Sequence, residues 1–366
     1  MLNAFVEGTL TIVLPLLMLE RKINIVTIGL VYASLPMIFL FTRIIFAALS
    51  DMSGRKIFFI LNGMLNSLNV FFYYFAFTPL EFLAGKITEG VKDASIWSVN
   101  RAFLLEHSKD KRKTLSQMMA INYVSIAFGS LIAGFLIAWI FYPNTLIFCL
   151  LISILLIPVS FLLQETYEKR PEARSFLDFL DLRRREESFK RFLLLFLLTG
   201  LAYGFTGLPT GGYILPIFLL ENGFDSKTIG VLISLHMLLT GLSIPFFAKM
   251  KTEKVLLYGG LFYSIILFLL GLARYIWAAF FILLLGIALG IIHSAQEGIF
   301  SKATRDESYG SDVGLLLTGL HAGRSISLAF SGFLIASFGF FAPFWLSALT
   351  FLIISFCILY FKISKS

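Results

Sequence analysis

The chain has 366 residues, of which 58% are hydrophobic and only 14% are charged. An ordinary soluble domain has roughly 45–50% apolar and about 25% charged residues, and a folded protein of this size keeps a large wetted surface. The composition, with 41 Phe and a mean hydropathy of +0.87, therefore excludes a cytosolic enzyme, a nucleic-acid-binding domain and a disordered chain. The main solvent is predicted to be the lipid bilayer.

The charge and the cysteines agree with a membrane protein. The net charge of +8 is typical of membrane proteins whose Lys and Arg collect in cytoplasmic loops, so we expect no nucleic-acid partner. Cys149 and Cys357 each lie in a long apolar run and form neither a disulfide framework nor a metal motif. No metal and no cofactor are expected.

Twelve apolar runs are long enough to cross a bilayer, which takes about 20 residues in a helix. They show neither the even strand spacing nor the alternation of a β-barrel, so we expect helices. The fold class predicted is an all-α integral membrane protein with twelve transmembrane helices. The runs are 2–19, 24–49, 57–77, 79–105, 114–141, 144–164, 191–220, 228–248, 254–273, 275–300, 311–338 and 340–361.

The distribution of Lys and Arg predicts the orientation. With the amino terminus inside, 21 of them fall in inner segments and 4 in outer loops, so both termini are predicted to be cytoplasmic in a multi-pass protein of the cell membrane. The longest polar segment, 165–190, is predicted to be a cytoplasmic linker. It separates an amino-terminal bundle, 1–164, from a carboxy-terminal bundle, 191–366.

A repeat relates the two bundles. The segment Pro15–Glu20 reads PLLMLE and Pro216–Glu221 reads PIFLLE, and seven residues after each Glu the chain reads Thr-Ile-Gly, at 27–29 and at 228–230. Both matches have an offset of 201 residues. In so apolar a chain one match would be weak, but matches in order indicate duplicated halves.

A third match supports the same conclusion. Gly134–Ala138 and Gly332–Ala336 both read GFLIA, at an offset of 198 residues. Because each half holds six spans, the halves have the same orientation, which is one plan of secondary transporters with the substrate site between the repeats. By this offset the first helix is about ten residues short, so we expect it to be either naturally short or truncated, with truncation favoured.

The loop after the second run carries a recognisable motif. Residues 47–56 read AALSDMSGRK, which resembles the signature G-x-x-x-D-x-x-G-R-K of the major facilitator superfamily, with Ala47 in place of the first Gly. The resemblance implies an inner gate in which Asp51 caps the helix that begins near 311–314 and Glu106 pairs with Arg55. The residues of this gate are Asp51, Gly54, Arg55, Lys56 and Glu106.

Ionisable residues inside the spans are candidates for the transport site, because a charge at mid-membrane is costly unless it is paired or wetted. In the fourth run Lys86, Glu89, Asp93 and Trp97 lie within about 80° on one helix face. We predict that this stripe lines a cavity. An internal salt bridge between Lys86 and Glu89, which would hold the helix to a neighbour, is the alternative.

Three further spans contribute polar residues to the predicted substrate and proton cavity. Glu7 in the first span is a candidate proton or cation site or, equally, a partner for Lys86 or Arg324. The tenth span offers one face with a His, a Gln and a Glu, and the eleventh a His and an Arg three residues apart, the Arg being suited to an anion or a buried carboxylate. They are His293, Gln296, Glu297, His321 and Arg324.

These features predict a secondary active transporter that moves a small molecule by alternating access, with protons or another ion as the coupling partner. Efflux of a metabolite or drug is preferred over uptake. The alternatives are a polytopic membrane enzyme, for which the loops outside the linker are short, and a membrane sensor that transports nothing. We therefore expect no enzymatic activity.

The predicted topology can be tested by labelling. Cysteines introduced at Arg170, in the linker, and at Asn222, in an outer loop, should react with a membrane-impermeant maleimide from opposite sides of the membrane. Labelling of both positions from the same side would contradict the orientation.

Overall fold

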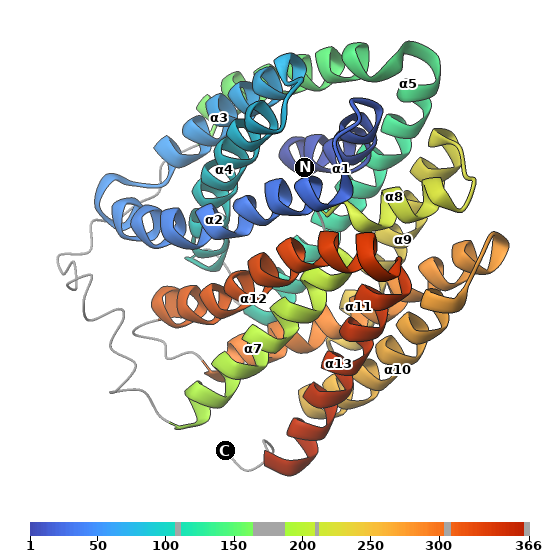
Figure 1. Cartoon of the computed structure of the whole chain (residues 1–366). Coiled ribbons are helices and arrows are strands. Elements are labelled where there is room, and N and C mark those ends of the chain that lie inside the picture. Colours follow the sequence, from blue (N-terminus) through green and yellow to red (C-terminus); the bar gives the residue numbers. More distant parts are fainter. Residues whose placement is uncertain (107–110, 164–186, 209–211, 304–308, 362–366) are drawn as a thin grey trace.

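The computed structural model describes residues 1–106, 111–163, 187–208, 212–303 and 309–361. Within these ranges the chain is helical, and its helices form two bundles that pack against each other (Figure 1). The all-α class with two repeated halves is thereby confirmed. The first half holds α1 (Leu2–Glu20), α2 (Ile25–Ser53), α3 (Lys56–Phe75), α4 (Pro79–Glu106) and α5 (Lys111–Phe161). The second half holds α7 (Glu187–Thr206), α8 (Ile214–Glu221), α9 (Ser226–Phe247), α10 (Thr252–Leu272), α11 (Ile276–Ala303), α12 (Tyr309–Phe338) and α13 (Phe341–Phe361).

The predicted spans can be compared with these elements. The fifth and sixth runs form the two helical arms of α5, which turns back on itself at Phe141, where φ is 63° and ψ is 172°, so the two arms agree with two separate spans (Figure 1). The seventh run, predicted as one helix over 191–220, is instead divided between α7 and α8. Gly207 adopts a φ of +71° directly after α7, and Pro209, which has no backbone N–H, follows it in the sequence, so the helix ends there.

Nine helices of the described chain are long and apolar enough to cross a membrane. The two arms of α5 count as one helix among them. α4 is not in this set because it carries seven charged residues, and α12 is also outside it. The apolar side chains on the outside of the bundle, such as Phe246, Phe330 and Trp139, are more than half exposed and face the position of the lipid.

The repeat seen in the sequence recurs at the helix starts. The side chain of Asn24 caps α2 by accepting a hydrogen bond from the Thr27 N–H at 2.9 Å, and Asp225 caps α9 in the same way from Thr228 at 2.9 Å. Hydrogen bonds from Thr228 hold the pKa of the Asp225 carboxyl below its ordinary value. The two caps lie 201 residues apart, the same offset as the Thr-Ile-Gly matches.

The glycines of the repeat bring the two halves into backbone contact. A Cβ atom at Gly134 of α5 would lie 2.8 Å from the Cα of Gly230 of α9. A Cβ atom at Gly29 of α2 would lie 3.2 Å from the backbone N of Gly332 of α12. Each half therefore presents one glycine from each repeated motif, and the two contacts are related by the same internal symmetry as the sequence matches.

These contacts lie at one end of the molecule. Gly29 and Gly230 are in the first turns of α2 and α9, near the end where α1 and α8 finish, which we call the far side. The opposite end, where the second arm of α5 finishes and α7 begins, is called the linker side. Ser325 adds a hydrogen bond from its hydroxyl to the carbonyl of Ala33 at 2.7 Å, so α12 and α2 are joined along more than one turn.

Replacing Gly134 with Val should wedge the far side open, because the added side chain has no space beside Gly230. An overpacked contact costs about 1–3 kcal/mol, so the far-side-open population should rise about tenfold. Maleimide labelling of a cysteine placed at Leu35, in a background lacking Cys149 and Cys357, measures this from the far side. The control is Ala138→Val, at an exposed position of the same helix. Equal labelling of Gly134→Val and the control would contradict the wedge.

Candidate functional site

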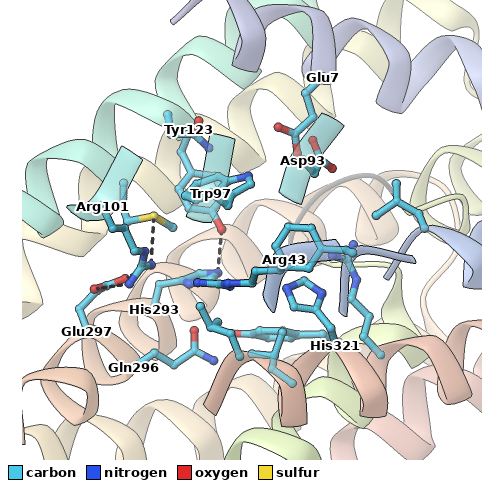
Figure 2. Close-up of a pocket in the computed structure, with 18 residues that line it drawn as sticks. Glu7, Arg43, Asp93, Trp97, Arg101, Tyr123, His293, Gln296, Glu297 and His321 are labelled. Atoms are coloured by element: carbon cyan, nitrogen blue, oxygen red, sulfur yellow. Dashed lines mark hydrogen bonds and ion pairs between the residues drawn. The ribbon is translucent and has the colours of Figure 1, made fainter. Parts of the chain in front are cut away.

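A cavity lies between the two halves (Figure 2). Its wall comes from α1, α2, α4 and α5 of the first half and from α7, α11 and α12 of the second. It mixes charged groups with aromatic rings. The lining residues are Glu7, Leu35, Phe39, Arg43, Asp93, Trp97, Arg101, Met119, Asn122, Tyr123, Tyr203, His293, Gln296, Glu297, Leu317, Leu320, His321 and Arg324.

Side-chain bonds join the halves at the linker-side end of this cavity. Arg101 of α4 and Glu297 of α11 form a two-point ion pair, with Nη2 to Oε1 at 2.7 Å and Nη1 to Oε2 at 3.3 Å (Figure 2). The hydroxyl of Tyr123 on α5 lies 2.7 Å from Nε2 of His293 on α11. Both contacts are buried, and both helices that carry the ion pair end within two turns of it, at Glu106 and at Ala303.

The predicted stripe of α4 divides between two environments. Asp93 and Trp97 line the cavity, whereas Lys86 and Glu89 do not. Lys86 Nζ lies 2.7 Å from Glu89 Oε2 and 4.2 Å from the centre of the Tyr32 ring, and Tyr73 of α3 donates a hydrogen bond to Glu89. The pair is therefore an internal salt bridge inside the first half, which was the alternative interpretation.

Asp93, at the cavity wall, forms an ion pair with Lys92, which lies off the predicted stripe of α4. Nζ of Lys92, which is fully buried, lies 2.8 Å from Oδ1 of Asp93. The carbonyl of Lys92 accepts a hydrogen bond from Asn62 of α3 at 3.0 Å. The cavity carboxylate is thus linked through Lys92 to the polar interior of the first half, where Asn66 donates to Asn3 of α1 at 3.1 Å.

The structure places the remaining predicted residues as follows. Glu7, His293, Gln296, Glu297, His321 and Arg324 all line the cavity. Of the predicted inner gate, Gly54 has a φ of 86° at the end of α2, Arg55 is buried and Lys56 begins α3. The side chains of Asp51 and Glu106, and those of the first residues of α12 that Asp51 was predicted to cap, lie outside the described residues, so these contacts stay predictions.

Ten of the lining residues were not proposed from the sequence, among them Arg43, Arg101 and Tyr123. Arg101 lies four residues after Trp97 and eight after Asp93, so helical spacing along the same face could have identified it. Arg43 is a charged residue inside the second predicted span, which is a signal that could have identified it, and no local signal distinguished Tyr123 from the other aromatic residues. In Figure 2 the Arg43 side chain extends between Trp97 and His321.

No group of three or more His, Cys, Asp or Glu that could hold a metal ion occurs among the described residues. The cavity instead offers three arginine side chains, three carboxylates and six aromatic or imidazole rings. Such a wall can bind a small molecule by charge and ring contact, and it holds the paired acids and bases through which a proton can be exchanged.

Comparison with known proteins assigns the family. The family model of the Major Facilitator Superfamily matches residues 1–221 and 210–366, so the whole chain is covered. The chain therefore belongs to the Major Facilitator Superfamily, as the loop at 47–56 indicated. No curated protein sequence matches the chain.

Solved structures of transporters share the fold. The human organic anion transporter MFSD10 (TETRAN) superposes with a TM-score of 0.72 at 17% identity, covering 98% of this chain and 97% of that protein. A variant of the nucleoside transporter NupG gives 0.75 at 14% identity, with 98% and 96% covered. A variant of the E. coli fucose:proton symporter FucP gives 0.68 at 14% identity, with 98% and 95% covered. At these identities the likeness concerns the fold.

The ion pair between the halves can be tested by a double-mutant cycle. Arg101→Gln and Glu297→Gln each leave a buried charge without its partner, which costs about 3–5 kcal/mol and should lower the melting temperature of the detergent-purified protein. The double variant removes both charges and should melt above either single variant. Lys254→Gln, at an exposed position, is the control. If the double variant lost as much melting temperature as the two single variants together, the coupling between Arg101 and Glu297 would be contradicted.

Proposed function

We propose that the protein is a secondary transporter that moves a small molecule across the cell membrane by alternating access, driven by protons, with both termini in the cytoplasm. The observation that carries the proposal is the cavity between the halves, which are joined toward the far side by glycine contacts and toward the linker side by the Arg101–Glu297 pair. Opening of the cavity to one side would then separate the contacts on that side while those on the other side are kept. We favour efflux over uptake.

The proposed mechanism also assigns boundaries to the two bundles. The halves 1–164 and 191–366 are proposed to move as rigid units around the cavity, with 165–190 as the cytoplasmic linker between them. Their own packing supports this, because each half is held by close helix contacts of its own. Gly8 of α1 packs on the backbone of Ile126 of α5, and Gly200 of α7 packs on Leu320 of α12.

Asp93 is the proposed proton carrier. Its carboxylate meets the cavity on one side and Lys92 on the other, so it can take a proton when Lys92 is drawn toward another acid and release it when the pair re-forms. Glu89 and Glu7 supply other carboxylates to the same region of the first half. In Figure 2 Glu7 and Asp93 lie toward the same side of the cavity.

Substitution of Asp93 tests the coupling. In proteoliposomes Asp93→Asn should abolish transport driven by a pH gradient while leaving counterflow exchange of substrate largely intact, because exchange needs no net proton movement. A panel of metabolites and drugs, with and without the gradient, identifies the substrate for both assays.

The control for this experiment is Asp225→Asn, because the repeat already uses Asn24 as the equivalent helix cap. Both assays should be unchanged in that variant. Gradient-driven transport at the wild-type rate by Asp93→Asn, or loss of folding alone, would remove Asp93 from the proton path.

A further inference from the structure

We infer that Lys86, Tyr32 and Tyr213, which we call the far-side cluster, hold the two halves together on the far side of the cavity. Lys86 and Tyr32 belong to the first half and Tyr213 to the second. The inference rests on the proposed function, since separation of the halves on one side is a step of alternating access. It is carried by a continuous series of contacts from a buried charge pair of the first half to α8 of the second.

Two buried tyrosines make the contact across the halves. The ring centres of Tyr32 on α2 and Tyr213, the N-cap residue of α8, are 5.3 Å apart, with the ring planes at 54°. This distance is in the range where aromatic pairs attract each other. Tyr32 lies one turn nearer to the far-side start of α2 than Leu35, which lines the cavity. Opening of the cavity to the far side therefore has to part these rings.

The hydroxyl of Tyr213 fixes the position of its ring. It donates a hydrogen bond to the carbonyl of Leu328 on α12 at 3.2 Å. A Cβ atom added at Gly29 of α2 would lie 2.8 Å from the same hydroxyl oxygen. Because Gly29 has no side chain, the Tyr213 hydroxyl lies directly against the backbone of the first half. Tyr213 thus meets α2 at two positions one turn apart, Gly29 and Tyr32.

Lys86 contacts the Tyr32 ring from within the first half. Its Nζ lies 4.2 Å from the centre of this ring and 2.7 Å from Oε2 of Glu89. An ammonium is attracted by the negative face of an aromatic ring, and the attraction is strongest where water is excluded. Lys86 and Tyr32 are both buried. Glu89, which also accepts a hydrogen bond from Tyr73, therefore holds the ammonium in place beside the Tyr32 ring.

The salt bridge between Lys86 and Glu89 thereby acts beyond its own half. Lys86 does not line the cavity and acts on the opposite half through Tyr32, so it is a positioning residue. A purely internal salt bridge would affect the stability of the first half and leave the far side unchanged. The far-side cluster predicts instead that loss of the pair makes the far side open more readily.

The hydroxyl of Tyr32 provides a matched control. It has no hydrogen-bond partner among the described residues, so the ring alone carries the contacts with Lys86 and Tyr213. Tyr32→Phe keeps this ring, whereas Tyr32→Leu removes it. A second control is Tyr263 of α10, another buried tyrosine, whose ring packs at 4.4 Å on Phe351 of α13 within the second half.

Labelling from the far side measures the opening without any substrate. The assay is the one described for Gly134→Val, with Leu35→Cys as the reporter in a background lacking Cys149 and Cys357. The melting temperature of each detergent-purified variant, measured in parallel, shows whether the variant is folded.

Removal of either ring should open the far side. Tyr32→Leu and Tyr213→Leu should each raise the rate of maleimide labelling about tenfold. Tyr32→Phe and Tyr263→Leu should label within about twofold of the background. Labelling of Tyr32→Phe as fast as that expected of Tyr32→Leu would overturn the inference, because Phe keeps the ring contacts.

The charge pair is tested by the double variant Lys86→Met/Glu89→Gln. It removes both charges and so leaves neither one buried without its partner. Its labelling rate should rise about as much as that of Tyr32→Leu, and adding Tyr32→Leu to it should raise the rate no further, because both changes break the same contact. Labelling at the background rate by the double variant, Tyr32→Leu or Tyr213→Leu, in a folded protein, would overturn the inference.

The two proposals fail in different assays. Labelling needs no transport, so faster labelling of these variants without counterflow by the unsubstituted protein in proteoliposomes would contradict the transporter and keep the far-side cluster. Counterflow by the unsubstituted protein, with labelling of the variants at the background rate, would keep the transporter and contradict the far-side cluster.

Discussion

At two points the two halves meet backbone against backbone. At Gly134 with Gly230, and at Gly29 with Gly332, a single added carbon would collide with the opposing main chain. Helices in lipid gain little from burying apolar side chains against each other, so close packing at small residues supplies much of their association. These two contacts fix how near the halves come at the far side, and hence the width of the cavity between them.

Pairing lowers the free-energy cost of burying the charges in and near the cavity. Most of the buried ionic groups form short pairs, either within the first half, as Lys86 with Glu89, or across the halves, as Arg101 with Glu297. A pair within one half travels with that half and costs nothing to move. A pair across the halves must separate when the linker side opens. The free energy of breaking this buried ion pair then adds to the barrier to opening.

Much of the fold could be predicted because its signals are local. Hydropathy defines a span from its own residues, and the glycines of the repeat stood out by their spacing alone. The division of α7 from α8 was missed because apolar residues continue on both sides of Gly207 and Pro209. Backbone conformation, rather than hydropathy, ends the helix there.

The site was harder to predict because helical spacing shows which residues share one face of a helix but does not show which helix packs against that face. Lys86, Glu89 and Asp93 do share one side of α4, yet α3 covers that side at the depth of Glu89, through Tyr73, and the cavity begins only at Asp93. Arg43 lies 58 residues before Arg101 in the chain, and only the packed helices bring both to one cavity. Contacts of this kind depend on the tertiary arrangement.

The polarity of α4 also bears on how the protein enters the membrane. A charged residue at the centre of an isolated helix costs about 2.5–3.5 kcal/mol to insert, and α4 brings Lys86, Glu89, Lys92 and Asp93 within two turns. Its partners precede it in the chain: Tyr73 and Asn62 on α3, and Tyr32 on α2. During synthesis α4 therefore has to leave the translocon as part of a group, with α2 and α3 held beside it until its charges are matched.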